Sequence, residues 1–262
     1  MNEEQVIQNG VIEQFRFVQL YDLTTAEMIV RLTSQEDAQL ECTTESDEVV
    51  DATGAPITTI YKAKKANYTG NESTFDFNLA AAQFGTKLEK ATADNKILVP
   101  ASESLEAKDG KLTLKHKPAK PIKYIYKLVK NKLASKLELS GAIEAAPTEG
   151  TFKINETEIV LPENTTGTFL VDYEYESEKA VQVVNNSAKF PTAAMFKASV
   201  YMRDACTDER FLAWIVADKA KIDPAQLTLA FNSQGKHPVT INFLKDYCAN
   251  DADLFKIIAV ND

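Results

Sequence analysis

Histidine and cysteine have the widest catalytic repertoire of the side chains in this sequence, and few of them are present. His116 and His237 are the two histidines, and each lies beside lysine and proline in a loop-like stretch. A general base or a metal ligand needs neighbours that orient its ring and tune its charge. We therefore expect both histidines to lie at the surface without a catalytic role.

Three cysteines, Cys42, Cys206 and Cys248, are odd in number and widely spaced, which fits free thiols in a reducing compartment. The run NDADLF at Asn250 to Phe255 comes nearest to a calcium loop, but it lacks the required glycine and the last glutamate. The sequence contains no phosphate-binding loop, nucleophile elbow or zinc-protease motif. We predict no enzyme, no metal and no cofactor.

Composition and charge narrow the class of protein further. A hydrophobic content of 44% is enough to build a sizeable core. The net charge of −9 argues against a sequence-specific nucleic-acid reader, because such proteins gather Lys and Arg to neutralise phosphates. The N-terminus, MNEEQVIQNG, has neither a basic start nor an apolar run. We expect synthesis in the cytoplasm and no membrane partner.

Alternating apolar and polar residues predict strands along most of the chain. Residues 17–20 and 28–32 flank a polar segment and predict a hairpin, and Asp109-Gly110 predicts a tight hairpin turn. A short strand is expected around Thr157 to Leu161. Other strand-like runs are IKYIYKLV, TFLVDYEYESE, MFKASVYM, FLAWIVA, QLTLAF and VTINFL.

FLAWIVA is apolar on both faces, which predicts a central strand of the sheet. Its Trp214 should then be buried beside the strands from Phe196 to Met202 and from Leu227 to Phe231. The sequence supports one helix, at about residues 74–84, with Ser73 as N-cap, Asp76 in the first turn and Gly85 as the C′ residue. The predicted fold is mainly β: an antiparallel β-sandwich or barrel with long extended hairpins and one short helix.

The segment ITTIYKAKKANY, from Ile57 to Tyr68, is a long strand with polar or charged residues on both faces. The alternation changes phase near Lys64 and Lys65, which predicts a β-bulge there. Such a strand fits an edge that pairs with another copy of the protein, or a solvated hairpin whose lysines protect its edge. The candidate inter-subunit residues are Ile57, Thr59, Tyr61, Lys62, Lys64, Lys65 and Tyr68.

The order of these features resembles the major tail tube proteins of bacteriophages. The likeness rests on the YDLTTAEM hairpin, the segment DATGAPITTIYKAKKANYT, the STFDFNLAAAQFGT helix, and a C-terminal half from SAKFPTAAMFKASVYMRD through LTLAFNSQ. It covers most of the chain as one tail-tube-like domain, 1–262, and is weakest over residues 86–165. An all-β decoration or adhesion protein of the virion is the alternative, and a jelly-roll enzyme is a third reading that lacks a histidine and carboxylate pocket.

The resemblance implies rings of six subunits that stack into a hollow tube in the virion tail. The implied partners are other copies of the chain, other tail proteins, and genome DNA that passes without specific binding. In VDYEYESE, Asp172, Glu174 and Glu176 fall on one side of a strand and could line the lumen, where carboxylates would keep the duplex mobile. The same alternation also fits an outward solvated face.

Overall fold

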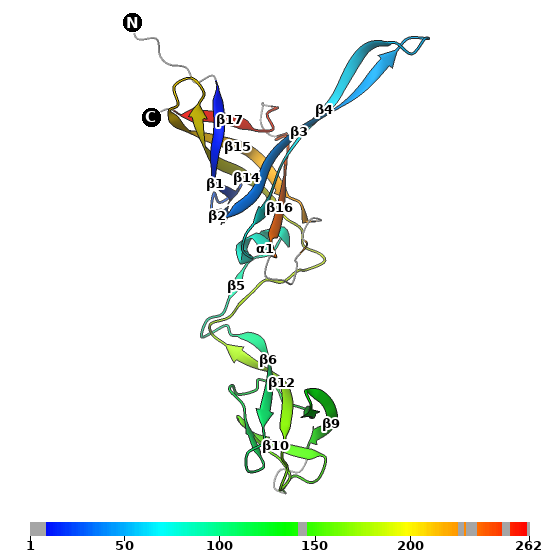
Figure 1. The fold of residues 1–262 in the computed structure, drawn as a ribbon, viewed down its shortest axis with the longest axis vertical. Coiled ribbons are helices and arrows are strands. Elements are labelled where there is room, and N and C mark those ends of the chain that lie inside the picture. Colours follow the sequence, from blue (N-terminus) through cyan, green and yellow to red (C-terminus); the bar gives the residue numbers. More distant parts are fainter. Residues whose placement is uncertain (1–8, 141–145, 225–227, 229–234, 248–251, 261–262) are drawn as a thin grey trace. The chain divides into compact units, whose positions relative to one another are not determined.

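The structure is a computed structural model that describes residues 9–140, 146–224, 228, 235–247 and 252–260. Contacts divide the chain into two compact units: unit 1 comprises Met1–Leu88 and Val183–Asp262, and unit 2 comprises Glu89–Gln182. Both units are built mainly from antiparallel strands, which confirms the predicted fold class (Figure 1). The segment 86–165, where the likeness is weakest, lies in unit 2 from Glu89 onward. The single-domain extent of 1–262 stays a prediction.

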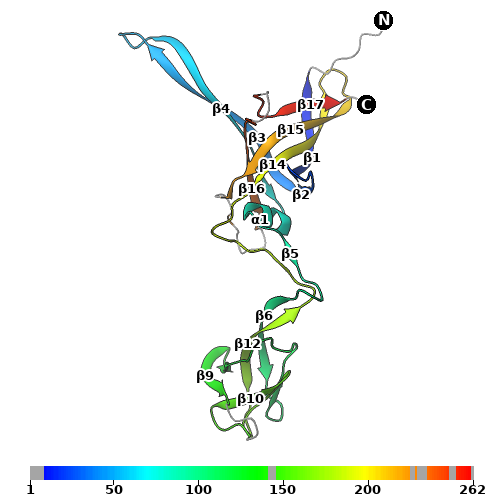
Figure 2. The same cartoon turned by 180° about the vertical axis from the view of Figure 1, so that it is seen from behind.

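Unit 1 is a nearly closed, barrel-like antiparallel sheet with the strand order β2-β1-β14-β15-β16-β4-β3, and β17 pairs with β15 (Figures 1 and 2). The strand bounds are β1 (Gly10–Asp22), β2 (Met28–Leu32), β3 (Gln35–Val50), β4 (Pro56–Glu72), β14 (Ala193–Asp204), β15 (Arg210–Ile222), β16 (His237–Phe243) and β17 (Lys256–Val260). The pairing of β1 with β2 confirms the first predicted hairpin.

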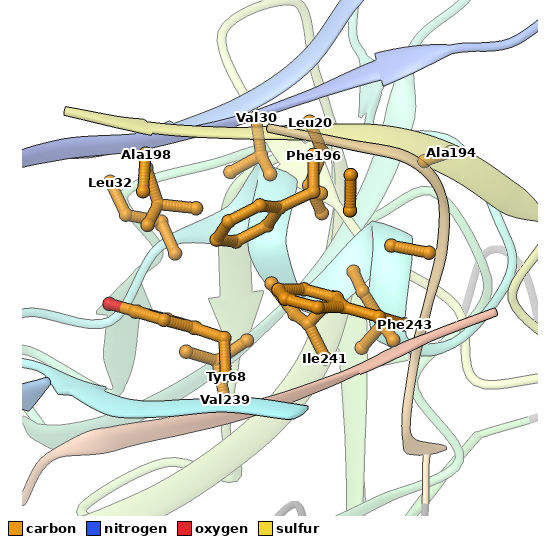
Figure 3. Close-up of a cluster of buried hydrophobic side chains, with 14 of the residues drawn as sticks. Leu20, Val30, Leu32, Tyr68, Ala194, Phe196, Ala198, Val239, Ile241 and Phe243 are labelled. Atoms are coloured by element: carbon orange, nitrogen blue, oxygen red, sulfur yellow. The ribbon is translucent and has the colours of Figure 1, made fainter. Parts of the chain in front are cut away.

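The core of unit 1 is formed by side chains that alternate along the strands and meet inside the barrel (Figure 3). Phe196 of β14 is fully buried, and its ring centroid lies 5.4 Å from that of Tyr68 and 4.9 Å from that of Phe243. Val30 and Leu32 of β2 pack into the same cluster. Aromatic pairs at these distances add to the free energy gained by burying apolar area.

The strand β15 is central, as predicted, because β14 occupies one edge while β16 and β17 share the other. The predicted burial of Trp214 is wrong: the side chain is half-buried and packs edge-on against Phe17, 5.7 Å away. The inward face of β15 instead carries Phe211 and small residues such as Ala213 and Ala217. Alternation forces Trp214 to the opposite face. The predicted neighbours Leu227 to Phe231 lie outside the described residues, apart from Thr228.

The helix forms where it was expected, as α1 (Phe77–Gln83), but its start differs. Asp76 is the N-cap, because its side chain accepts a 2.8 Å hydrogen bond from the backbone N–H of Leu79. Ser73, the predicted cap, instead donates its hydroxyl to the backbone oxygen of Ser34 at 2.8 Å. An acidic cap is favoured over serine here because it also complements the helix dipole.

Gly85 ends the helix as predicted, with a φ of +65° that glycine adopts without strain. The N–H of Thr86 bonds to the carbonyl of Ala81 at 2.9 Å, and the N–H of Gly85 bonds to that of Ala82 at 3.2 Å, which is a Schellman motif. A Cβ at Gly85 would lie 2.3 Å from the backbone of Phe190. Both the dihedral angle and the close contact therefore require glycine.

Unit 2 has its own sheet, with the order β6-β12-β8-β9-β10-β11-β7, and a two-stranded pair of β5 with β13. The pairing of β9 with β10 is parallel, and the other pairs are antiparallel. The bounds are β5 (Glu89–Lys90), β6 (Ile97–Glu106), β7 (Lys111–Thr113), β8 (Tyr124–Val129), β9 (Lys132–Leu139), β10 (Thr151–Asn155), β11 (Glu158–Val160), β12 (Thr168–Ser177) and β13 (Val181–Gln182). Phe152, Phe169 and Ile125 are fully buried in a separate core.

The Asp109-Gly110 turn is confirmed, since both residues have positive φ (50° and 71°) and Lys108 forms a bridge with Lys111. The strands on either side do not continue as a hairpin. β6 pairs with β12, and β7 pairs with β11. The turn therefore redirects the chain between different parts of the sheet.

We predict that Phe196→Ala lowers the free energy of unfolding of unit 1 by about 3–5 kcal/mol, because it leaves a cavity in the barrel core. Trp214→Ala is the comparison and should give a smaller loss, since that side chain is half-buried. Urea unfolding followed by far-ultraviolet circular dichroism measures both. An equal or larger loss in Trp214→Ala would contradict the assigned faces of β15.

Candidate functional site

The strands β3 and β4 form a long hairpin whose register runs from Val50↔Pro56 at the turn to Gln35↔Glu72 at the barrel. Its outer part, residues 41–65, is here called the arm. In both views the arm extends away from the barrel of unit 1 (Figures 1 and 2). At its turn, Asp51 accepts hydrogen bonds from Thr53 and Ala55, chiefly from the Thr53 hydroxyl, and they lower the pKa of its carboxyl group.

Near the barrel, β4 is an ordinary inner strand. β16 pairs with it from Asn67 to Glu72, while β3 occupies the opposite edge. Tyr68 was predicted in the inter-subunit strand, but it is 4% exposed and lies in the core of unit 1. Its hydroxyl donates to Oε1 of Gln35 at 3.1 Å, and burial raises its pKa. Since both neighbouring strands are present, Tyr68 cannot pair with a further strand.

The pairing with β16 ends at Asn67, whereas β4 continues from there toward the turn of the hairpin. From Pro56 to Ala66, the edge of β4 that faces away from β3 has no strand partner among the described residues. Ile57, Ile60 and Tyr61 are 66%, 53% and 72% exposed. The segment thus combines unpaired backbone groups with apolar side chains in water, an arrangement that favours pairing with another chain.

The other predicted residues of this strand, Thr59, Lys62, Lys64 and Lys65, also lie on the exposed segment. The predicted bulge exists slightly nearer the tip: the register shifts between Thr44↔Lys64 and Ser46↔Tyr61, which leaves one extra residue on β4. Such an irregularity bends the strand and increases its twist.

Two of the three lysines on the arm face carboxylates of β3. Lys62 pairs with Asp47 at 2.5 Å, and Lys65 pairs with Glu45. These side chains are more than half exposed, so each pair contributes little to stability. The pairs nevertheless neutralise charges that would otherwise repel another strand at this edge.

The alternation predicted for Asp172, Glu174 and Glu176 is present on β12, where all three are exposed and Val171 and Tyr173 are buried on the other face. These carboxylates belong to unit 2 and are therefore in a different unit from the β3–β4 hairpin. Glu174 pairs with Lys120 at 2.6 Å, and Glu176 lies 4.0 Å from Lys96. Two members of the stripe thus have a lysine partner.

On the buried face of β12, Tyr173 donates a hydrogen bond to Glu103 and accepts one from the backbone N–H of His116 at 3.2 Å. Burial, followed by the hydrogen bond to Glu103, raises the pKa of Tyr173 to about 12. The ring of His116 is exposed and stacks on Tyr175 with centroids 3.9 Å apart. These contacts fix the loop before β8 against the sheet.

The surface position predicted for His237 is wrong. His237 begins β16 and is 1% exposed. Its Nδ1 accepts the backbone N–H of Asp76 at 3.2 Å, so the proton lies on Nε2, which donates to Oε1 of Gln83 at 2.8 Å. The ring stacks on Phe75, 4.8 Å away. This histidine joins the start of α1 to the sheet, and burial lowers its pKa.

The remaining candidate groups are the cysteines and the acidic side chains. Cys42 and Cys206 are exposed free thiols, and Cys248 lies outside the described residues. Within the described part of the chain, no three His, Cys, Asp or Glu side chains gather as a metal site. Among the same described residues, no helix is long and apolar enough to cross a membrane.

The sequence analysis missed β3 (Gln35–Val50), the partner strand of the arm. Its outer residues are exposed on both faces, so no apolar alternation marks it. The available signal was charge: residues 35–51 contain seven carboxylates and no Lys or Arg. A long acidic segment opposite a lysine-containing strand is the cross-strand pattern expected of a hairpin.

We predict that unit 1 loses stability as the pH falls from 7 to about 5.5. The pKa of His237 is lowered on folding, so the unfolded chain binds the proton more readily below the ordinary value of about 6.5. His237→Asn keeps an acceptor for the Asp76 N–H but does not titrate, and it should remove this part of the pH dependence. Thermal unfolding at several pH values measures the effect, and parallel losses in both proteins would contradict it.

A comparison with family models matches residues 10–257 to the YomU/Tube protein family. No curated protein matched the chain. The matched range includes the β3–β4 hairpin, the helix and all of unit 2. Because the match covers nearly the whole sequence, the chain belongs to the YomU/Tube protein family, a family of phage tail tube proteins.

Proposed function

We propose that copies of this protein pair through the arm, close into rings of six, and stack into the tail tube through which phage DNA passes. Family membership already implies a structural virion component. The observation that carries the finer proposal is the edge of β4 from Pro56 to Ala66, which has no strand partner among the described residues and whose residues 56–65 are all exposed. Synthesis in the host cytoplasm and contacts with other tail proteins belong to the same proposal.

An edge of this kind is unusual for a protein that stays monomeric. Natural monomers shorten such edges, cover them, or protect them with unpaired charges and prolines. On the arm, two of three lysines are already paired with β3, and the stretch from Ile57 to Ala66 contains no proline. Each backbone hydrogen bond made by a partner strand would contribute about 1 kcal/mol net, so a row of them would stabilise the contact.

The arm offers a natural partner for this edge, because among the described strands β3 pairs only with β4. If β4 of one copy pairs with β3 of the next, the strand directions alternate and the new pairing is antiparallel. Such a contact is head-to-tail, and it gives a closed ring when the rotation between copies closes. A closed ring of arms has no free edges left.

The same arrangement suits a channel for DNA. Carboxylates outnumber lysines on the β3–β4 hairpin, with seven acidic residues between 35 and 51 alone. A wall with excess negative charge would repel the phosphates of DNA. It would also lack the Lys and Arg contacts that bind phosphates by releasing counterions. The duplex would then pass without specific binding. Lumen positions for Asp172, Glu174 and Glu176 of unit 2 are part of this proposal.

We predict that proline in the arm abolishes tubes while leaving the barrel folded. Successive residues direct their N–H groups to opposite edges, so Thr59→Pro and Ile60→Pro are tested separately, and one of them removes a donor from the free edge. Thr59→Ala is the control and should assemble normally. Negative-stain electron microscopy measures tubes, and circular dichroism measures folding. Normal tubes from both proline variants would refute pairing through this edge.

A second prediction concerns the β12 carboxylates. Changing Asp172, Glu174 and Glu176 to lysine in an assembled particle should leave the tubes normal but make DNA passage slow at low salt, because lysines would bind phosphates. Replacing the same residues with Asn, Gln and Gln is the control that removes charge without adding attraction. DNA release measured against salt concentration is the readout. Unchanged passage of the lysine particle at low salt would place this stripe outside the lumen.

A further inference from the structure

A second feature of the chain is a concentration of lysine in unit 2. Residues 111–136 contain nine lysines and no carboxylate, although the protein as a whole carries a net charge of −9. Four of these lysines form ion pairs with carboxylates elsewhere in unit 2: Lys111, Lys117, Lys120 and Lys136. The remaining positive charge is concentrated at the turn between β8 and β9.

We call this turn the lysine tip and define it as Lys127, Val129, Lys130, Lys132 and Leu133. None of its three lysines has an ion pair with any residue that the structure describes. Lys130 and Lys132 are exposed, and the apolar residues on either side of them are exposed as well, Val129 by 53% and Leu133 by 64%. Neighbouring like charges repel, so this arrangement does not stabilise unit 2 itself.

From this arrangement we infer that the lysine tip is a docking surface for the acidic arm of a second copy of the chain. The inference rests on the proposed self-assembly and adds a contact that strand pairing does not supply. The arm has the complementary charge, and its Glu41 and Glu48 have no ion pair among the described residues. Strand pairing uses the backbone edges, whereas these side chains project from the faces and stay available.

Charge also explains why a contact of this kind would be needed. Copies with a net charge of −9 repel one another as they approach, and the repulsion grows with every copy added. A positive tip that meets a negative arm offsets the repulsion locally, selects the correct partner surface, and speeds encounter. The exposed Val129 and Leu133 would then be covered by the arm, whose Ile57 and Tyr61 are also exposed.

The test is charge reversal on both surfaces, using the full chain. One variant carries Lys127→Glu, Lys130→Glu and Lys132→Glu, and the other carries Glu41→Lys and Glu48→Lys. Each alone should need about a tenfold higher concentration to assemble at low salt, as expected from the loss of a few exposed ion pairs. The defect should shrink at high salt, where such charges are screened. A mixture of the two variants should assemble like the wild type.

The control variant is Lys90→Glu, Lys123→Glu and Lys179→Glu, which makes the same charge change at exposed lysines of unit 2 outside the tip, and Lys123 precedes the opposite end of β8. It should stay within about twofold of the wild type if position matters more than net charge. An equal defect in the control, or normal assembly of the tip variant, would overturn the inference. Circular dichroism of each variant excludes misfolding as the cause.

The remaining outcomes separate the rival contacts. A chain with all five substitutions that assembles, while the mixture does not, would place the contact within one copy and overturn the inference. Binding of duplex DNA that the tip variant loses while its assembly stays normal would identify a nucleic acid as the partner instead. A wild type that never self-associates would count against both proposals. Normal tubes from the proline variants, together with rescue in the mixture, would contradict only the strand pairing.

Discussion

The length mismatch between β4 and β16 is the constraint on which the arrangement of unit 1 depends. β4 has 17 residues and β16 has 7, so β16 satisfies the backbone of β4 only from Asn67 to Glu72. Over that stretch, β4 is an inner strand whose side chains alternate between core and surface. Beyond it, nothing in the described chain covers the second edge, and the side chains lose their alternation. One strand thus belongs to the barrel at one end and presents a free edge at the other.

A feature of the fold could be predicted from the sequence when its conformation depends on residues that are close to it in the chain. The Asp109-Gly110 turn and the Gly85 helix end were predictable because dihedral preferences act within a few residues. The stripe on β12 was predictable because one face is buried and the other is solvated. The orientation of Trp214 was not predictable, since a run that is apolar on both faces does not say which face meets the core. His237 was missed because its burial depends on α1, whose Gln83 lies far away in sequence.

Tyr68 shows the same limit within a single strand. Tyr61 and Tyr68 were both predicted in the inter-subunit strand, with a change of phase between them, yet Tyr68 lies in the core and Tyr61 is 72% exposed. The difference depends on where β16 stops, which no residue of β4 encodes. The register shift near Lys62 does not explain it, because Tyr61 pairs with Ser46 and Tyr68 with Leu40, which places both tyrosines on the same face of the hairpin. The alternation along one strand therefore predicts which side chains are buried only over the stretch where neighbouring strands pair with it.

The proposed assembly would depend on two kinds of force. The free edge of the arm would act through backbone hydrogen bonds, which need close approach, depend little on salt, and are the same for any partner strand of the correct direction. The charges of the arm and of the lysine tip act over about 8–10 Å at moderate ionic strength and distinguish one surface from another. Backbone pairing alone would tolerate slipped or mismatched neighbours, particularly on a strand that is solvated on both faces. Charge placed away from the pairing edge would supply the selectivity that such a strand lacks, and it would do so without occupying the hydrogen-bonding groups.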